Sequence, residues 1–277
     1  MRTISIEGFE ASREANVGPA PMLQWLKISD LLVDPSYQRP IAVEGRRNVM
    51  RIARQFRWSY FAPVIVSPVE GGRFAIIDGQ HRTTAAALVG IDSVPCQVVV
   101  AARDEQAAAF KAINGMITPI SRMALHAAAL VAREPRAVEV AEVCASAGVE
   151  LLRYPVPLEQ QAPGQTMAVG AIEACLRRYG RETLAAALQC VTQTRNNHRG
   201  MLSARMIKAL CELLGEDPSL PTSWPVLLKA FDKIDLANVH DKSMLKAVER
   251  GSSRVSVIVD GLKSELAQRM RRLAAEC

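Results

Sequence analysis

The stretch "FAIIDGQHRTTAAALVG", residues 74–90, decides the fold of the N-terminal part of this chain. A short apolar run, Phe74–Ile77, is typical of a buried strand. The run stops at Asp78-Gly79, and an alanine-rich pattern typical of a helix starts within two residues and ends at Gly90. The sequence therefore predicts a strand that passes directly into a helix, with a cluster of polar side chains at the junction.

The junction residues are suited to binding an anion. Free backbone N–H groups in the first turn of a helix, together with the helix dipole, favour negative charge. Gly79 has no Cβ to obstruct a ligand, and Arg82 offers a forked, permanently charged donor to phosphate oxygens. His81 can donate a hydrogen bond or transfer a proton, and Asp78 can accept a hydrogen bond from a hydroxyl group or a metal-bound water. A second interpretation stays open, in which Asp78-Gly79 is a plain strand exit and Gln80, His81 and Arg82 are solvated around a helix start.

The residues around the junction complete a small mixed sheet with helices. Residues 23–29 predict a short strand, and residues 34–41, which contain two prolines, predict a loop. Residues 44–60 predict a helix whose apolar stripe lies opposite a basic row, Arg47, Arg51 and Arg54. Residues 63–78 predict two strands joined through Gly71-Gly72, and residues 94–100 predict a final strand. The aromatic run "FRWSYF", residues 56–61, is expected to pack in the core and against the hairpin.

Beyond Ala101 the sequence becomes almost wholly helical. Long segments rich in Ala, Leu, Glu and Arg predict helices near 104–113, 119–133, 136–147, 167–178, 182–192, 201–214, 223–233 and 254–275. We therefore predict an α+β protein with a leader at residues 1–20, a small mixed-sheet domain at residues 21–103 and a helical domain at residues 104–277. The segment 153–165, rich in Pro and Gln, is predicted to be a linker within the helical domain.

The composition is that of a globular protein. Of the 277 residues, 49% are hydrophobic and 22% are charged, and the formal net charge of +6 is compatible with a polyanionic partner. The six cysteines are scattered without a CxxC pair, which indicates a reduced cytoplasm and neither a disulfide framework nor a zinc site. No apolar stretch reaches the ~18 residues of a membrane span, and we expect no membrane association.

Residues 23–100 resemble the N-terminal domain of the ParB/sulfiredoxin superfamily, in the variants that carry a DGQHR motif. The similarity rests on "DPSYQRPI" (34–41), the arginine-rich helix and "APVIVSPVEGGRFAIIDGQHRTTAAALVGIDSVPCQVV" (62–99), which agree with the family in order and spacing. In ParB relatives the corresponding box grips a nucleoside triphosphate with the help of an upstream loop. The resemblance thus implies CTP or ATP with Mg²⁺ as a ligand. It assigns phosphate contacts to Gly79, Gln80, His81, Arg82, Thr83, Gln38 and Arg39.

Departures from the family pattern bear on activity. Where ParB relatives have Glu-Arg in the box, this chain has Gln80-His81, so one acid and one strong phosphate donor are missing. Sulfiredoxin has its reactive cysteine at the place of Gln80, and an amide has no nucleophilic thiol, so the chain is not expected to be a sulfiredoxin. Small kinases that act on free serine have acidic residues that Asp78 and Glu44 match. A phosphotransferase or nuclease that uses Asp78 and His81 therefore remains an alternative.

Metal and nucleic-acid contacts are less defined. ParB relatives hold a metal with a Glu-Asn pair after this domain; Asn114 lies at a loosely similar place, but Ile113 stands where the glutamate would be. DNA contacts are expected from the row Arg47, Arg51 and Arg54, and from the basic loop that contains Arg195 and Arg199; solvated surface is the alternative for both. The predicted function is that of a ParB-like protein of plasmid, phage or mobile-element type that binds a nucleotide, DNA or both. The protein is predicted to be cytoplasmic, and a homodimer is one possible assembly. A module that kept the fold and lost the ligand is the third interpretation.

Overall fold

The computed structural model describes all residues except 2, 11–16, 39, 117–118, 217–223 and 276–277. The chain forms two compact units, Met1–Thr118 and Pro119–Cys277, which we describe separately as the first and the second unit.

A mixed sheet of five strands forms the centre of the first unit. Its strands are β1 (Met22–Lys27), β2 (Leu31–Leu32), β3 (Val64–Val69), β4 (Arg73–Asp78) and β5 (Ser93–Val98), in the spatial order β1-β5-β3-β4-β2. β1 pairs with β5 and β3 pairs with β4 in antiparallel fashion, whereas β3–β5 and β2–β4 are parallel pairs. This topology confirms the predicted mixed sheet; the short strand β2 was not predicted.

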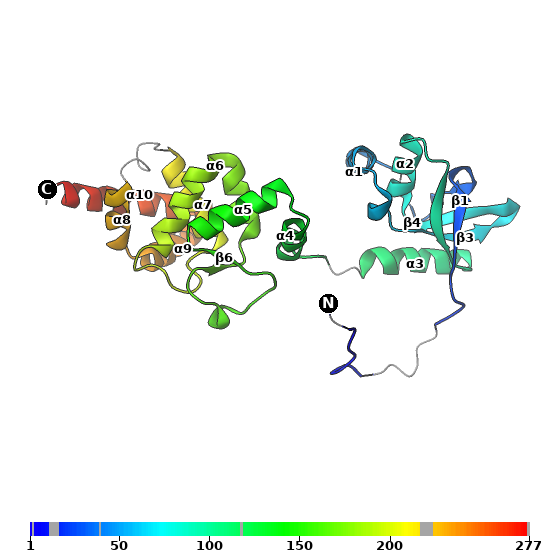
Figure 1. Cartoon of the computed structure of the whole chain (residues 1–277), viewed down its shortest axis with the longest axis horizontal. Coiled ribbons are helices and arrows are strands. Elements are labelled where there is room, and N and C mark those ends of the chain that lie inside the picture. The colour runs from blue at the N-terminus through cyan, green and yellow to red at the C-terminus, as the bar shows by residue number, and fades with distance from the viewer. Residues whose placement is uncertain (2, 11–16, 39, 117–118, 217–223, 276–277) are drawn as a thin grey trace. The chain divides into compact units, whose positions relative to one another are not determined.

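Three helices pack around the sheet: α1 (Val43–Arg54), α2 (Gln80–Leu88) and α3 (Arg103–Gly115). Figure 1 shows α1 and α2 on one side of the sheet and α3 on the other side. Ala85 and Ala86 on α2 are fully buried, because their small side chains let the helix approach the sheet closely. The core is completed by residues from the three central strands: Val64, Val66, Ile76, Val94, Cys96 and Val98.

Helix α3 belongs to the first unit, so the boundary between the units lies near residue 118, whereas the sequence placed it near residue 103. The reason is a set of contacts between residues far apart in the chain. The Arg103 Nε atom donates a hydrogen bond to the Asp34 carboxylate at 2.9 Å, and the Tyr37 and Phe110 rings are 5.7 Å apart between centroids. Gln106 is buried against the same loop and donates to the carbonyl of Ala101. Composition alone carries no signal for these contacts.

The second unit is a helical assembly around one large core. Its helices are α4 (Arg122–Val131), α5 (Pro135–Ser146), α6 (Val169–Thr192), α7 (Ala204–Glu216), α8 (Trp224–Asp232), α9 (Leu236–Arg250) and α10 (Arg254–Ala275). α6 joins two predicted helices and is kinked at Gly180, where φ is 82°. Two-residue strands, β6 (Glu150–Leu151) and β7 (Gln165–Thr166), pair in parallel, and the segment predicted as a linker connects them within this unit. The helical character after α3 is as predicted, but α9 was missed.

The described residues contain no helix that is both long enough and apolar enough to cross a membrane. Five cysteines are described, and all five are buried and unpaired. Burial raises the pKa of the Cys96 thiol to about 11 and that of the Cys144 thiol to about 12, so both thiols stay protonated at neutral pH.

Candidate functional site

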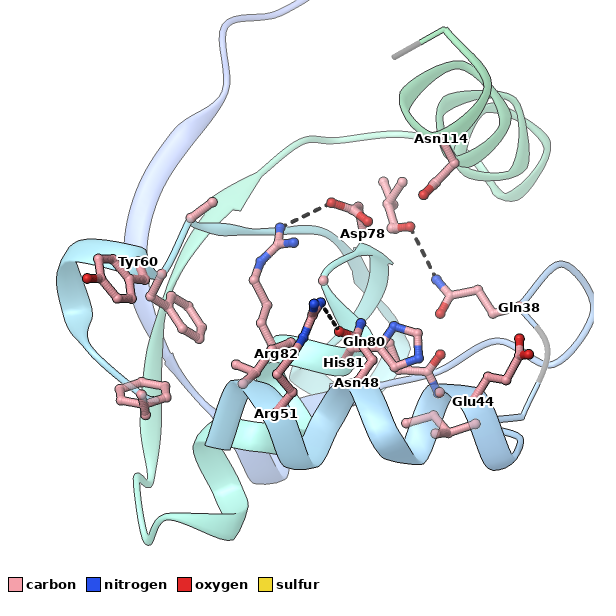
Figure 2. Close-up of a pocket in the computed structure, with 18 of the residues that line it drawn as sticks. Gln38, Glu44, Asn48, Arg51, Tyr60, Asp78, Gln80, His81, Arg82 and Asn114 are labelled. Atoms are coloured by element: carbon pink, nitrogen blue, oxygen red, sulfur yellow. Dashed lines mark hydrogen bonds and ion pairs between the residues drawn. The ribbon is translucent and has the colours of Figure 1, made fainter. Parts of the chain in front are cut away.

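A cleft of about 700 Å³ opens in the first unit at the end of strand β4. Five parts of the chain border this cleft: the loop after β2, helix α1, the segment between α1 and β3, the junction between β4 and α2, and the last turns of α3. Figure 2 shows side chains from all five parts around the cleft. The cleft therefore brings together residues that are far apart in the sequence: Gln38 and Asn114, which both line it, are separated by about eighty positions.

Gly79 shapes the β4–α2 junction. Its φ of 111° and ψ of 12° are left-handed values that favour glycine, and it is the N-cap residue of α2 without a side-chain cap. The first helical hydrogen bond runs from the Thr83 N–H to the Gly79 carbonyl at 3.0 Å, so the N–H groups of Gln80, His81 and Arg82 precede it. An uncapped helix start of this kind is a favourable place for an anion. A Cβ at position 79 would also lie only 2.9 Å from the Nε and Cζ atoms of Arg82.

Arg82 ties the start of α2 to two other parts of the first unit. Its Nη2 atom donates to the Pro63 carbonyl at 2.7 Å and to the Asp78 carboxylate at 3.1 Å. The two charged side chains are 23% and 29% exposed, respectively, so the pair is largely shielded from water. The Arg82 Nε atom is buried and has no hydrogen-bond partner in the described part of the protein. The guanidinium thus borders the cleft with donor capacity that the Asp78 contact does not use.

Helix α1 supplies the opposite wall of the cleft. A Cβ at Gly45 would lie 2.9 Å from the His81 Nε2 atom, so glycine at this position lets the imidazole lie close against α1. Asn48 and Arg51 are joined by a hydrogen bond of 2.8 Å from the Arg51 Nη2 atom, and both line the cleft. Glu44 lines it one turn earlier. The wall therefore carries one cationic, one amide and one acidic side chain.

Hydrogen bonds hold the loop after β2 against the sheet. The Gln38 side chain is buried, and its Nε2 atom donates to the carbonyls of Ile76 and Ile77 on β4. Hydrogen bonds from Arg103 and from Ser36 hold the pKa of Asp34 well below its usual range. Burial raises the pKa of the neighbouring Tyr37. Gln38 lines the cleft, with its amide N–H₂ group used by the fold, and its predicted phosphate contact stays a prediction; Arg39 lies outside the described residues.

Helix α3 contributes Asn114 and Phe110 to the cleft. Asn114 is exposed, and its Nδ2 atom donates to the Phe110 carbonyl at 2.9 Å, which leaves the Oδ1 atom as an acceptor. Among the residues that the structure describes, no group of three or more His, Cys, Asp or Glu side chains is arranged to hold a metal ion. The role of Asn114 in metal binding stays a prediction.

Several predicted site residues are not among those that line the cleft. Thr83 is buried, and its hydroxyl donates to the Gly79 carbonyl at 3.0 Å. Arg47 and Arg54 line a shallow groove on the outer face of α1, and only Arg51 of the predicted basic row also borders the cleft. Arg195 and Arg199 belong to the second unit.

The two arginines of the second unit are next to a structural loop. The Arg195 backbone N–H donates to the Asp232 carboxylate, and the Arg199 guanidinium donates to the Glu159 carbonyl at 3.0 Å. Asn196 between them is buried and accepts a hydrogen bond from the N–H of Leu236 at the start of α9. The loop therefore helps to hold the helices together, which the basic composition did not indicate.

The sequence analysis did not predict that residues of the aromatic run 56–61 line one end of the cleft. Phe56, Trp58 and Phe61 do pack together, with ring centroids 5.2–5.7 Å apart. Tyr60, from the same aromatic run, is 71% exposed and lines the cleft together with Arg57. The pattern of the run gave no signal for this difference, because the turn geometry decides which ring points inward.

The fold and the cleft define the first unit as a small α+β domain with a cleft at a strand-to-helix junction. Residues 26–116 match the sequence profile of the ParB N-terminal domain. Residues 26–116 of the first unit are therefore a ParB N-terminal-type domain, as the resemblance predicted. The match extends through α3, in agreement with the boundary between the two units.

Solved structures show distant likeness. A C-terminally truncated chromosome-partitioning protein ParB from Caulobacter crescentus, complexed with CTP-gamma-S, is 14% identical over 60% of this chain and 98% of its own, with a TM-score of 0.42. The truncated ParB of the same organism complexed to the centromeric parS site is 15% identical over 87% and 99%, with a TM-score of 0.30. Sulfiredoxin from Arabidopsis thaliana is 18% identical over 32% and 97%, with a TM-score of 0.27. No curated protein sequence matches the chain significantly.

Proposed function

We propose that the first unit binds the phosphate groups of a nucleotide at the β4–α2 junction, and that the protein acts as a ParB-like nucleotide- and DNA-binding protein in the cytoplasm. The observation that carries the proposal is the convergence of the uncapped start of α2, Arg82 and Arg51 on one cleft. Backbone N–H groups and guanidinium groups are the donors that proteins commonly use for phosphate. The ParB N-terminal domain match supports the same ligand class.

The acidic side chains of the cleft fit a nucleotide that arrives with Mg²⁺. Mg²⁺ commonly binds through one or two carboxylates together with substrate phosphates and waters. Asp78, Glu44 and the Asn114 Oδ1 atom offer oxygen ligands around the cleft, whereas the described residues form no cluster that would hold the ion alone. When bound, Mg²⁺ would neutralise phosphate charge near these carboxylates. Asp78 would then face the ion, and Arg82 would face the phosphate.

The outer face of α1 is our candidate for the DNA contact. Four arginines line its shallow groove, and in the described part of the chain none of them pairs with an acidic side chain: Arg46, Arg47, Arg51 and Arg54. Phosphate contacts of this kind give affinity without sequence preference. A plasmid, phage or mobile-element setting is the corresponding biological proposal.

A thermal-shift screen tests the nucleotide proposal. A ligand that binds only the folded protein must raise its melting temperature. We expect a shift from at least one nucleoside triphosphate in the presence of Mg²⁺, and a smaller shift from inorganic phosphate at the same concentration. If none of the four common nucleoside triphosphates changes the melting temperature at millimolar concentration, with or without Mg²⁺, the proposal is wrong.

The enzymatic alternative has less support from the geometry. Asp78 and His81 both line the cleft, but the Asp78 carboxylate accepts a hydrogen bond from Arg82. Its Oδ2 atom is therefore already engaged by the guanidinium and is not free to contact a substrate. Turnover of ATP or CTP that disappears in Asp78→Asn would nevertheless establish the enzyme.

A further inference from the structure

Tyr60 differs from the other aromatic residues of its segment. Its side chain is 71% exposed and lines the same cleft as Arg82 and the start of α2. No described aromatic ring packs against it. The Arg57 guanidinium lies over the ring, 5.8 Å from its centroid. Tyr60 thus presents an exposed aromatic ring at the cleft that also contains Arg82 and the start of α2.

The turn that carries Tyr60 is firmly anchored. Tyr60 ends the 3₁₀ turn Trp58–Tyr60, in which its N–H donates to the Arg57 carbonyl at 2.9 Å. The flanking rings of Trp58 and Phe61 are 5.5 Å apart between centroids, and Trp58 also contacts Trp25 on β1 at 5.2 Å. A ring held on an anchored turn loses little conformational freedom when a ligand packs against it.

We propose that Tyr60 is the stacking platform for the base of the nucleotide whose phosphates lie at the β4–α2 junction. This inference rests on the proposed function and extends it to a second part of the ligand. Figure 2 shows Tyr60 on the side of the cleft opposite Gln38 and Asn114, with Arg82 between the two sides. A nucleotide with its phosphates at Arg82 can therefore extend its base toward Tyr60. The base lies on the ring, and Arg57 adds a cation at the same end of the cleft.

Stacking on an aromatic ring tolerates every base, because each base has a π-face. The platform should therefore add affinity for ATP and for CTP, and it should add none for a ligand that consists of phosphates alone. Inorganic tripolyphosphate is such a ligand. The difference in affinity between a nucleoside triphosphate and tripolyphosphate is the quantity that reports on Tyr60.

The test measures ATP, CTP and tripolyphosphate binding by calorimetry, in Mg²⁺, for the full chain and three variants. In Tyr60→Ala we expect affinity for ATP and CTP to fall about five- to tenfold and affinity for tripolyphosphate to stay unchanged. Tyr60→Phe keeps the ring and should bind all three ligands as the wild type does. Tyr154→Ala is the matched control, because Tyr154 is 68% exposed, belongs to the second unit and does not line the cleft.

Two results would overturn the inference, and they differ from each other. If Tyr60→Ala leaves nucleotide affinity unchanged, or weakens tripolyphosphate by the same factor, Tyr60 is not a base platform although the phosphate site stands. If the wild type binds neither nucleotide nor tripolyphosphate, the proposed function fails and the platform fails with it. A melting curve for each variant separates lost binding from lost folding.

Discussion

Replacing Arg82 with alanine should weaken nucleotide binding by roughly ten- to a hundredfold. The guanidinium borders the cleft beside the uncapped start of α2, where it can bond to phosphate oxygens. A hydrogen bond to a charged group contributes about 1.5–3 kcal/mol, and each 1.4 kcal/mol corresponds to about a factor of ten in the dissociation constant. Arg82→Lys keeps the charge but loses the planar fork, so its affinity should lie between those of the alanine variant and the wild type.

The same substitution should also lower the free energy of unfolding. Arg82→Ala removes the 2.7 Å hydrogen bond to the Pro63 carbonyl and the 3.1 Å ion pair with Asp78. Because both charged side chains are partly exposed, we expect a cost of about 1–2 kcal/mol, below the sum of two buried interactions. The protein should remain folded at 25 °C, where binding is measured.

The assay is calorimetric titration with ATP and CTP in Mg²⁺, with a chemical denaturation curve for each variant. Arg73→Ala is the matched control, because Arg73 begins the same strand, is exposed and does not line the cleft. The control should bind as the wild type does. The reasoning is refuted if Arg82→Ala binds as tightly as the wild type, or if its loss of binding is fully explained by the fraction of unfolded protein.

Four further predictions concern the cleft and its surroundings. Gly79→Ala should lower the free energy of unfolding by about 1–3 kcal/mol and also weaken nucleotide binding, because the new Cβ would lie 2.9 Å from Arg82. Gly90→Ala is the control, since Gly90 has a φ of +81° and nothing lies near its Cβ. Denaturation and binding curves should show that the control loses stability from backbone strain and keeps its nucleotide affinity. Three exposed arginines of α1, Arg46, Arg47 and Arg54, can be changed together to glutamine. The slope of log affinity for DNA against log salt concentration should then decrease in magnitude by about 2–3. An unchanged slope would show that this face of α1 does not contact DNA. Folding lowers the pKa of Asp34, so its contact with Arg103 stabilises the protein above a pH of about 3.9, and this stabilisation is lost as the pH falls toward the folded-state pKa. The melting temperature of Asp34→Asn should therefore fall less steeply below pH 4 than that of the wild type. Parallel curves of melting temperature against pH for the two proteins would contradict this. Asp78→Asn should keep or strengthen nucleotide binding in a pure binding site and should abolish turnover in a catalytic one, as a binding titration and a phosphate-release assay would show.

The sequence predicted the parts of the fold that depend on neighbouring residues. The apolar run 74–77, the glycine at position 79 and the alanines of α2 lie next to each other, so their periodicity specifies the strand, the turn and the helix together. The strand β2 was missed because two residues carry no period and pair only with the distant β4. Helix α9 was missed although Asp235 caps it by accepting a hydrogen bond from the Asn238 N–H, a short-range signal that the sequence does contain.

The candidate site was only partly predictable for the same reason. The DGQHR segment identified the junction, since its charged side chains stand beside a glycine at a strand end. Gly45 and Asn48 could not be found, because their place at the cleft depends on how α1 packs against α2. Thr83 follows the box in sequence, yet helical geometry turns its hydroxyl back to the Gly79 carbonyl. Position in a motif therefore does not determine which side chains face a ligand.

The contact between Arg82 and Asp78 constrains how any phosphate can bind. Asp78 is four residues before Arg82, and the two side chains are paired at 3.1 Å across the turn that Gly79 forms. A phosphate that approaches Arg82 meets the negative charge of Asp78 at the same place, which opposes binding. Two changes would relieve that repulsion: a divalent cation that Asp78 would help to hold and that would neutralise its charge, or loss of the carboxylate charge. Nucleotide affinity should for this reason depend on Mg²⁺ more strongly in the wild type than in Asp78→Asn. Such a difference would show that Asp78 and Arg82 act on the same bound nucleotide.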